Sequence, residues 1–189
     1  MSVLDIALDR WQPGHFHFIW ASIPCAPYSN AHTRGTPDLE NADLLSRHTL
    51  NLIKTLAPKV FVCENPATGK LRKRSFMSDI PWAEVSYCKY EPEWGYRKQT
   101  ILFSNLWEKT SYRPETCKKD CLAMFNGRHR CSAQRGPLRP YASYPHDHSW
   151  KLEELYRIPP KLCSEIVRQV EECILREQLA ANFRLDVSF

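Results

Sequence analysis

The 189-residue sequence contains no long apolar run and few glycines. No stretch approaches the roughly 20 apolar residues that a membrane-spanning helix needs, and the N-terminus lacks the basic-then-apolar order of a secretory signal peptide. The six glycines are so far apart that no two can form a ligand-gripping glycine loop.

Because the sequence shows neither a membrane span nor a signal peptide, we expect an intracellular protein, in the cytoplasm or nucleus, whose thiols are kept reduced.

The composition is that of a globular domain, with 43% hydrophobic and 25% charged residues. The net charge of +5 is compatible with a nucleic-acid partner, although many proteins without one reach the same value. Eight cysteines are present. In a reducing compartment they indicate catalysis, metal binding or simple burial rather than a disulfide framework.

The clearest pattern is a strand, a helix and a second strand. The apolar run 16–21 predicts the first strand, and 60–63 predicts a buried parallel strand. Between them, Thr36 is the expected cap and Pro37 the first residue of an amphipathic helix that runs to Leu56. Further strands are expected at 84–88 and 100–103, and a final helix at 162–174. This order predicts an α/β fold with a right-handed crossover.

From about residue 105 to 150 the periodicity disappears, and Pro, Cys, His and Arg dominate. We expect a small irregular insert there, held by something other than a large core. Its cysteines include Cys117-x₃-Cys121-x₇-His129-x-Cys131, a set that could form a tetrahedral zinc site and supply folding energy. The alternative is a basic, solvated loop with incidental cysteines.

Two predicted strands end in residues that can carry chemistry. Pro24-Cys25 follows the first strand and Glu64-Asn65-Pro66 leaves the second. The carboxyl ends of adjacent parallel strands open into one crevice. There, a thiolate could add to an electron-poor pyrimidine carbon while an acid hydrogen-bonds the ring nitrogen. Taken singly, Cys25 could be a core thiol and Glu64 a helix cap.

These motifs resemble those of the cytosine-5 DNA methyltransferase family. The stretch Ile23–Ser29 is similar to its catalytic loop, and Glu64-Asn65-Pro66 to its Glu-Asn-Val motif with Pro in place of Val. Gly95–Phe103 resembles its Arg-containing motif, and Ile158–Leu162 its terminal motif. The nearer likeness is to compact viral or phage-type relatives, which would place the protein in a host cell.

The resemblance implies a partial doubly wound, Rossmann-like methyltransferase sheet and methyl transfer from S-adenosylmethionine to a flipped cytosine in DNA through a covalent cysteine adduct. It implies that Cys25 is the nucleophile, that Glu64 protonates or hydrogen-bonds the ring, and that Asn65 orients the ring or the loop. Arg97 would support the base or a phosphate, and Pro24 would touch the cofactor. The residues expected to contact DNA are Ser29, Arg34, Arg72, Lys73, Arg74 and Lys98.

The same resemblance implies three parts. Residues 1–104 would form the catalytic α/β part, 105–157 a target-recognition insert, and 158–189 a helix that returns to the catalytic part. The basic residues of the insert, interleaved with aromatic ones, suit phosphate contact and groove reading. A solvated charged face is the alternative.

One departure from the family concerns the methyl donor. The family's Phe-x-Gly-x-Gly loop and the acidic residue that binds the ribose are not found, as if about 50–70 residues of a nucleotide-binding half were missing. Three explanations are open: a second polypeptide supplies that half, the chain is a non-catalytic DNA-binding remnant, or the cofactor is held by another route. An enzyme that modifies a pyrimidine in RNA or in a nucleotide is a further alternative.

Overall fold

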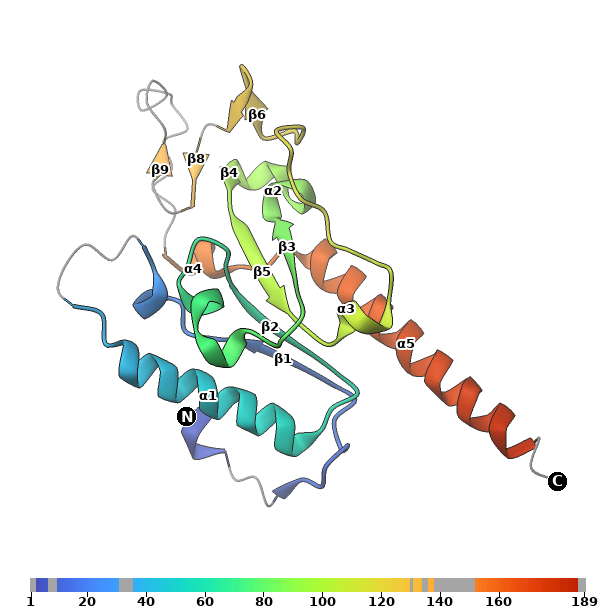
Figure 1. The fold of residues 1–189 in the computed structure, drawn as a ribbon. Coiled ribbons are helices and arrows are strands. Elements are labelled where there is room, and N and C mark those ends of the chain that lie inside the picture. The colour runs from blue at the N-terminus through green and yellow to red at the C-terminus, as the bar shows by residue number, and fades with distance from the viewer. Residues whose placement is uncertain are drawn as a thin grey trace.

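The computed structural model describes residues 3–6, 10–30, 36–129, 131–133, 136–137 and 152–186. Its centre is a four-stranded sheet in the order β1-β2-β5-β3 (Figure 1). The strands are β1 (Phe18–Ser22), β2 (Val60–Pro66), β3 (Trp82–Ser86) and β5 (Gln99–Phe103). β1 and β2 are parallel, joined through α1 (Leu39–Leu56), while β5 runs antiparallel to both β2 and β3.

This arrangement confirms the α/β class and the predicted strand-helix-strand order. The sheet is mixed because β5 is antiparallel to both of its neighbours. The doubly wound arrangement implied by the family resemblance therefore stays a prediction. The strand predicted at 84–88 is displaced, since β3 ends at Ser86 and the short helix α2 (Tyr87–Tyr90) follows at once.

The ends of α1 follow from local hydrogen bonding. Its cap is Asp38 rather than the predicted Thr36, because the Asp38 carboxylate accepts the Asn41 backbone N–H at 2.9 Å. At the other end, Ala57 adopts a left-handed conformation (φ 45°) and its N–H donates to the Ile53 carbonyl at 3.0 Å. The following residue, Pro58, could not continue the helix.

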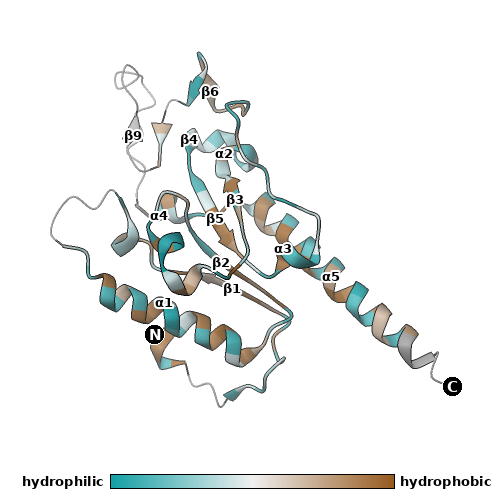
Figure 2. Cartoon of the chain, viewed as in Figure 1, coloured by the Kyte–Doolittle hydropathy of each residue, from teal (hydrophilic) through white to brown (hydrophobic). Residues whose placement is uncertain are grey.

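Helices cover both faces of the sheet. On one face, Ile53 of α1 packs in a cluster with Cys63, Ile101 and Phe103 of the strands. On the other face, the N-terminal half of α5 (Pro160–Asp186) buries an apolar stripe against β2, β3 and β5. That stripe consists of Leu162, Ile166, Val170 and Cys173. Figure 2 shows the apolar colouring of the central strands and the two-sided colouring of α1 and α5.

The remaining elements are short. Besides α2, they are β4 (Tyr96–Arg97), α3 (Leu106–Lys109), β6 (Met124–Phe125), β7 (Arg128–His129), β8 (Cys131–Ser132), β9 (Gly136–Pro137) and α4 (Leu152–Tyr156). Single 3₁₀ turns occur at Val3–Asp5, Ala26–Tyr28, Leu71–Lys73, Ser75–Met77 and Pro92–Trp94. β4 pairs in parallel with β8, so the insert adds to the region that follows α2. No helix among the described residues is both long and apolar enough to cross a bilayer.

The packing of α5 predicts a contrast between its two halves. Ile166 is fully buried, so Ile166→Ala should lower the free energy of unfolding by about 2–5 kcal/mol through lost burial and a residual cavity. Leu179 is 56% exposed, and Leu179→Ala should change it by less than about 0.5 kcal/mol. Urea denaturation followed by circular dichroism measures both. Equal losses in the two variants would contradict this account of α5.

Candidate active site

Cys25 lies just beyond the end of β1, at the start of a 3₁₀ turn. The Cys25 carbonyl accepts the Tyr28 backbone N–H at 3.1 Å, which closes the turn and leaves the thiol half-buried. Tyr28 is fully buried, and its hydroxyl donates to Asp43 at 2.9 Å and lies 3.0 Å from the Ser46 hydroxyl, both on α1. Tyr28 therefore anchors the cysteine loop to the helix, a role that sequence reasoning did not assign.

The exit of β2 lies directly beside this loop. Ser22 of β1 is paired in register with Glu64 of β2, and the Asn65 side-chain amide donates to the Ile23 carbonyl at 2.9 Å. Farther on, the Lys70 backbone N–H donates to the Tyr28 carbonyl at 2.8 Å, and the Asn30 side chain donates to the Thr68 carbonyl. The two strand ends thus form one connected unit, as parallel pairing of their strands predicts.

Gly69 lies in a closely packed part of this unit. A Cβ at this position would lie 3.2 Å from the Pro66 carbonyl oxygen and 3.3 Å from Asn65 Oδ1. A side chain here would therefore require these neighbours to shift by a few tenths of an ångström. The buried Asn65 Oδ1 itself has no hydrogen-bond partner in the part of the chain that the structure describes, so the Asn65 amide is held by its nitrogen alone.

Glu64 is a buried carboxyl group among polar side chains, which include Tyr87, Lys98 and Thr100. The Tyr87 hydroxyl donates to Glu64 Oε1 at 3.2 Å, and the charge of Lys98 acts on the same group. Burial raises the pKa of Glu64, and Lys98 and Tyr87 partly oppose that rise. A raised pKa favours a carboxyl group that can hold or donate a proton to a ring nitrogen.

Lys98 is buried behind the site rather than exposed on a DNA-facing surface. Its Nζ donates to the Leu155 carbonyl at 2.8 Å and lies 4.7 Å from the centroid of the Tyr87 ring. Burial lowers the pKa of Lys98, while Glu64 and Cys25 raise it. The resemblance implied DNA contact for this residue, but its position makes it an electrostatic partner of the thiol and the carboxyl group.

The charges of Glu64 and Lys98 both act on the Cys25 thiol. Its pKa is raised, first by burial and then by the negative charge of Glu64, while Lys98 acts in the opposite direction. In this state the sulfur therefore holds its proton at neutral pH. Attack by Cys25 requires that proton to leave, and the Lys98 ammonium is the group placed to stabilise the resulting thiolate.

Arg97 lies apart from this group. It is exposed on β4 and lines a polar hollow of about 480 Å³ between the β2 exit and the insert. Lys119 and Arg128 contribute two further cationic side chains to the same hollow, and Thr68 borders it. Three cations around one hollow suit a phosphate group.

The other residues expected to contact DNA differ in how available they are. Arg72 and Lys73 are both exposed, and the Arg72 guanidinium lies 4.9 Å from the centroid of the Trp82 ring. The Arg74 guanidinium is instead paired with Asp43. Ser29 is half-buried beside the cysteine loop. Arg34 lies outside the described residues.

A second hollow, of about 660 Å³, runs along β1 and ends at Pro24. Its lining is mainly apolar, from β1, α1 and the N-terminal segment, and includes no acidic side chain. The residues that line it are Val3, Ile6, Trp11, Phe16, Phe18, Ile19, Trp20, Ala21, Ser22, Pro24, Leu45, Thr49, Leu52, Ile53 and Leu56.

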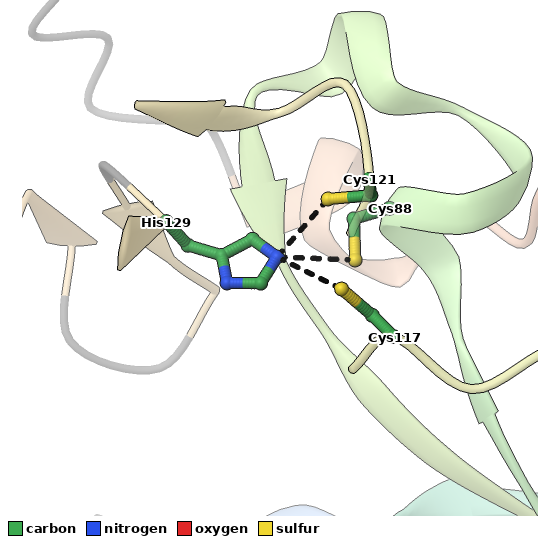
Figure 3. A group of neighbouring side chains, drawn as sticks. All are labelled: Cys88, Cys117, Cys121 and His129. Carbon is green, nitrogen blue, oxygen red and sulfur yellow. Dashed lines mark hydrogen bonds between the residues drawn. The ribbon is translucent and has the colours of Figure 1, made fainter. Parts of the chain in front are cut away.

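The predicted metal ligands are only partly brought together. Cys117, Cys121 and His129 converge, but Cys131, the predicted fourth ligand, is not in the group, and Cys88 of α2 takes its place (Figure 3). The potential ligand atoms of these four residues all lie within 4.8 Å of one another. No local spacing signal could have identified Cys88, because it is far from Cys117 in sequence and was expected inside a strand.

Comparison with known proteins agrees with the resemblance predicted from the motifs. No protein-family model matches the chain. The chain is 35% identical over 124 residues to the probable DNA (cytosine-5)-methyltransferase of Frog virus 3 (isolate Goorha), an alignment that covers 58% of this chain and 55% of that protein. The chain thus spans about half the length of the relative. The similarity confirms the resemblance expected from the motifs.

The electrostatics around Cys25 predict how its reactivity depends on pH. Glu64→Gln removes a negative charge that raises the Cys25 pKa, so alkylation of Cys25 by iodoacetamide should begin at lower pH than in the unmodified chain. Lys98→Met removes the opposing charge and should move alkylation to higher pH. Mass spectrometry of the Cys25 peptide, with rates measured from pH 6 to 10, follows both shifts.

The exposed residue Glu108 provides the control, because Glu108→Gln should leave the Cys25 profile in place. A profile that does not move in either Glu64→Gln or Lys98→Met would show that the three side chains are not electrostatically coupled.

Proposed function

We propose that this chain, which is 35% identical over 124 residues to a probable DNA (cytosine-5)-methyltransferase, carries the nucleophile and acid of such an enzyme. The observation that supports this most directly is the placement of Cys25 and the buried Glu64 at the ends of two paired parallel strands. The Asn65–Ile23 hydrogen bond holds one strand end against the other.

In the proposed reaction, a cytosine leaves the DNA stack so that its ring can reach the thiol. Cys25 loses its proton and its sulfur bonds to carbon 6, which pushes electrons from the carbon 5–carbon 6 double bond toward ring nitrogen 3. Glu64 hydrogen-bonds or protonates that nitrogen and stabilises the adduct. Lys98 supports the thiolate before attack.

S-adenosylmethionine would supply the methyl group that carbon 5 accepts. Carbon 5 then loses its hydrogen as a proton to a base, and the electron pair re-forms the double bond as the Cys25 sulfur leaves. Cys25 and Glu64 thereby return to their starting forms, and the cytosine departs with one added methyl group. The thiol acts as a covalent catalyst and is not consumed.

The proposed DNA surface combines the active-site loops with the insert. Arg97, Lys119 and Arg128 surround the polar hollow beside the β2 exit, where a backbone phosphate can be bound. Lys73 extends the positive charge along the neighbouring loop. In this proposal, residues 105–157 form the target-recognition insert and 1–104 with 158–189 the catalytic part.

The described residues do not by themselves fit the polar groups of S-adenosylmethionine. The hollow that ends at Pro24 has no carboxylate in its lining to bind a ribose or an ammonium group. β1 is the outermost strand of the described sheet, so its outer edge is available to a further element. We propose that a second polypeptide carrying the glycine loop docks along β1 and holds the donor beside Pro24.

Nucleophilic attack can be tested without a methyl donor. In D₂O, addition of Cys25 to carbon 6 lets carbon 5 take up a deuteron, and loss of the original hydrogen followed by expulsion of sulfur returns a deuterated cytosine. We expect a cytosine-containing oligonucleotide to gain deuterium at carbon 5, measured by mass spectrometry. Cys25→Ala should abolish the exchange, and Glu64→Gln should slow it by about 100-fold.

Cys173→Ala serves as the matched thiol control and should exchange at the unmodified rate, since the Cys173 sulfur lies on α5 next to the Lys109 carbonyl. Retention of exchange in Cys25→Ala would refute the proposed nucleophile. Running DNA, RNA and free nucleotide in parallel identifies the substrate, and exchange confined to RNA or nucleotide would overturn the DNA assignment.

The second-polypeptide proposal makes a separate prediction. Isothermal calorimetry of the chain alone should show no heat with S-adenosylmethionine, while titration with double-stranded DNA should show binding that weakens as salt increases. Saturable S-adenosylmethionine binding by the chain alone would refute the need for a partner. DNA binding without any deuterium exchange would favour a non-catalytic DNA-binding protein.

A further inference from the structure

The group of Cys88, Cys117, Cys121 and His129 plays no part in the proposed chemistry, yet it is the tightest cluster of ligand-type side chains among the described residues. Three separate segments build it. Cys88 comes from α2, Cys117 and Cys121 from the loop after α3, and His129 from β7. We propose that this cluster binds one Zn²⁺ ion, which fastens the insert to the catalytic part.

The first argument is that His129 Nε2 has too few hydrogen-bonding positions for the three sulfur atoms around it. Its Nε2 lies 3.5 Å from the sulfur of Cys88, 3.4 Å from that of Cys117 and 3.2 Å from that of Cys121 (Figure 3). A neutral imidazole nitrogen offers either one hydrogen or one lone pair. It can make one hydrogen bond well but not three at once, so hydrogen bonding leaves the convergence unexplained.

The second argument is that the sulfur–nitrogen distances match those of a tetrahedral zinc site. With zinc–sulfur bonds of about 2.3 Å and a zinc–nitrogen bond of about 2.0–2.1 Å, the sulfur and nitrogen ligands of a tetrahedral site lie about 3.5 Å apart. The three observed sulfur–nitrogen distances are 3.2–3.5 Å. Three thiolates and an imidazole are a ligand set that zinc favours, whereas calcium and magnesium favour oxygen.

The third argument is the way in which the chain turns to present the ligands. Lys119, midway between the two insert cysteines, has φ 70°, a left-handed conformation that is uncommon for lysine. Asn126-Gly127, at φ 47° and 73°, forms the tight turn between β6 and β7 that pairs His129 with Met124. Both turns bring their ligands back toward Cys88.

The fourth argument is that the insert has little else to hold it. Among the described residues of 115–133, the buried ones are Cys121, His129 and Cys131, and two of these are proposed ligands. The strands there are two residues long, and an isolated hairpin is marginally stable in water. A structural zinc ion contributes folding free energy directly, which such a segment requires.

The position of Cys88 connects the proposed ion to the candidate active site. The preceding residue, Tyr87, donates to Glu64, so one zinc ligand is the chain neighbour of a residue in the candidate active site. From the other side, β7 leads to β8, which pairs with β4 and carries Ser132 opposite Arg97. The ion would therefore fix the insert relative to both Glu64 and Arg97, an orienting role that rests on the proposed function.

The metal assignment can be tested independently of any activity. Purified chain should contain about one zinc ion per molecule by inductively coupled plasma mass spectrometry. Replacement of Zn²⁺ by Co²⁺ should give the intense visible bands of a tetrahedral site and the near-ultraviolet absorption of thiolate ligation. A protein that holds no zinc, or holds iron in its place, would overturn the assignment.

A pair of variants separates the structural ligand set from the sequence-based one. Cys88→Ser should weaken Zn²⁺ affinity by more than about 100-fold, because changes to residues that merely support a ligand already cost up to that much. Cys131→Ser replaces another buried cysteine of the same region and should retain the ion. The reverse result would favour the original Cys117, Cys121, His129 and Cys131 set.

His129 supplies a test that misfolding cannot imitate. His129→Ala should lose the ion, whereas His129→Cys should restore a four-thiolate site and strengthen the thiolate absorption of the Co²⁺ form. Failure of His129→Cys to bind Co²⁺, with a circular dichroism spectrum like that of the unmodified chain, would refute ligation by His129. Deuterium exchange at cytosine is measured separately, so either proposal can fail alone.

Discussion

The parallel pairing of β1 with β2 is the constraint on which the candidate site depends. It sets Ser22 opposite Glu64, and the Asn65 amide then donates to the Ile23 carbonyl next to Pro24. A slip of one residue would turn Glu64 to the other face of the sheet, because strand side chains alternate. Burial of Cys63 on one face and of Val60 and Val62 on the other opposes such a slip.

Much of this could be predicted from sequence because the information is local. Apolar runs predicted β1 and β2, helical spacing predicted α1 and the buried half of α5, and proline beside Cys25 and Glu64 marked the strand ends. The errors are also local. Asp38 competed successfully with Thr36 as the helix cap, and the strand expected to reach Cys88 ended at Ser86, where α2 begins.

What sequence reasoning missed depends on contacts between distant segments. Tyr28 anchors the cysteine loop through Asp43 and Ser46, and Lys98 approaches Glu64 only because β5 pairs with β2. The adjacent residues Arg97 and Lys98 differ in exposure. Arg97 is exposed at the hollow beside the insert, and Lys98 is buried near the Cys25 thiol. Side chains alternate along the extended segment that joins β4 to β5, which explains the difference, but the motif alone does not specify which residue faces inward.

Cys88 illustrates the same limit and links the two proposed sites. The sequence prediction chose Cys131 as a ligand because it follows His129 closely. In the folded chain, Cys88, which is far from Cys117 in sequence, completes the group instead. Since Tyr87 contacts Glu64 and Cys88 contacts His129, a displacement of α2 must affect the carboxyl group and the ligand cluster together. Because the core of the insert is so small, one ion bound there would contribute to its folding and fix its position relative to Glu64.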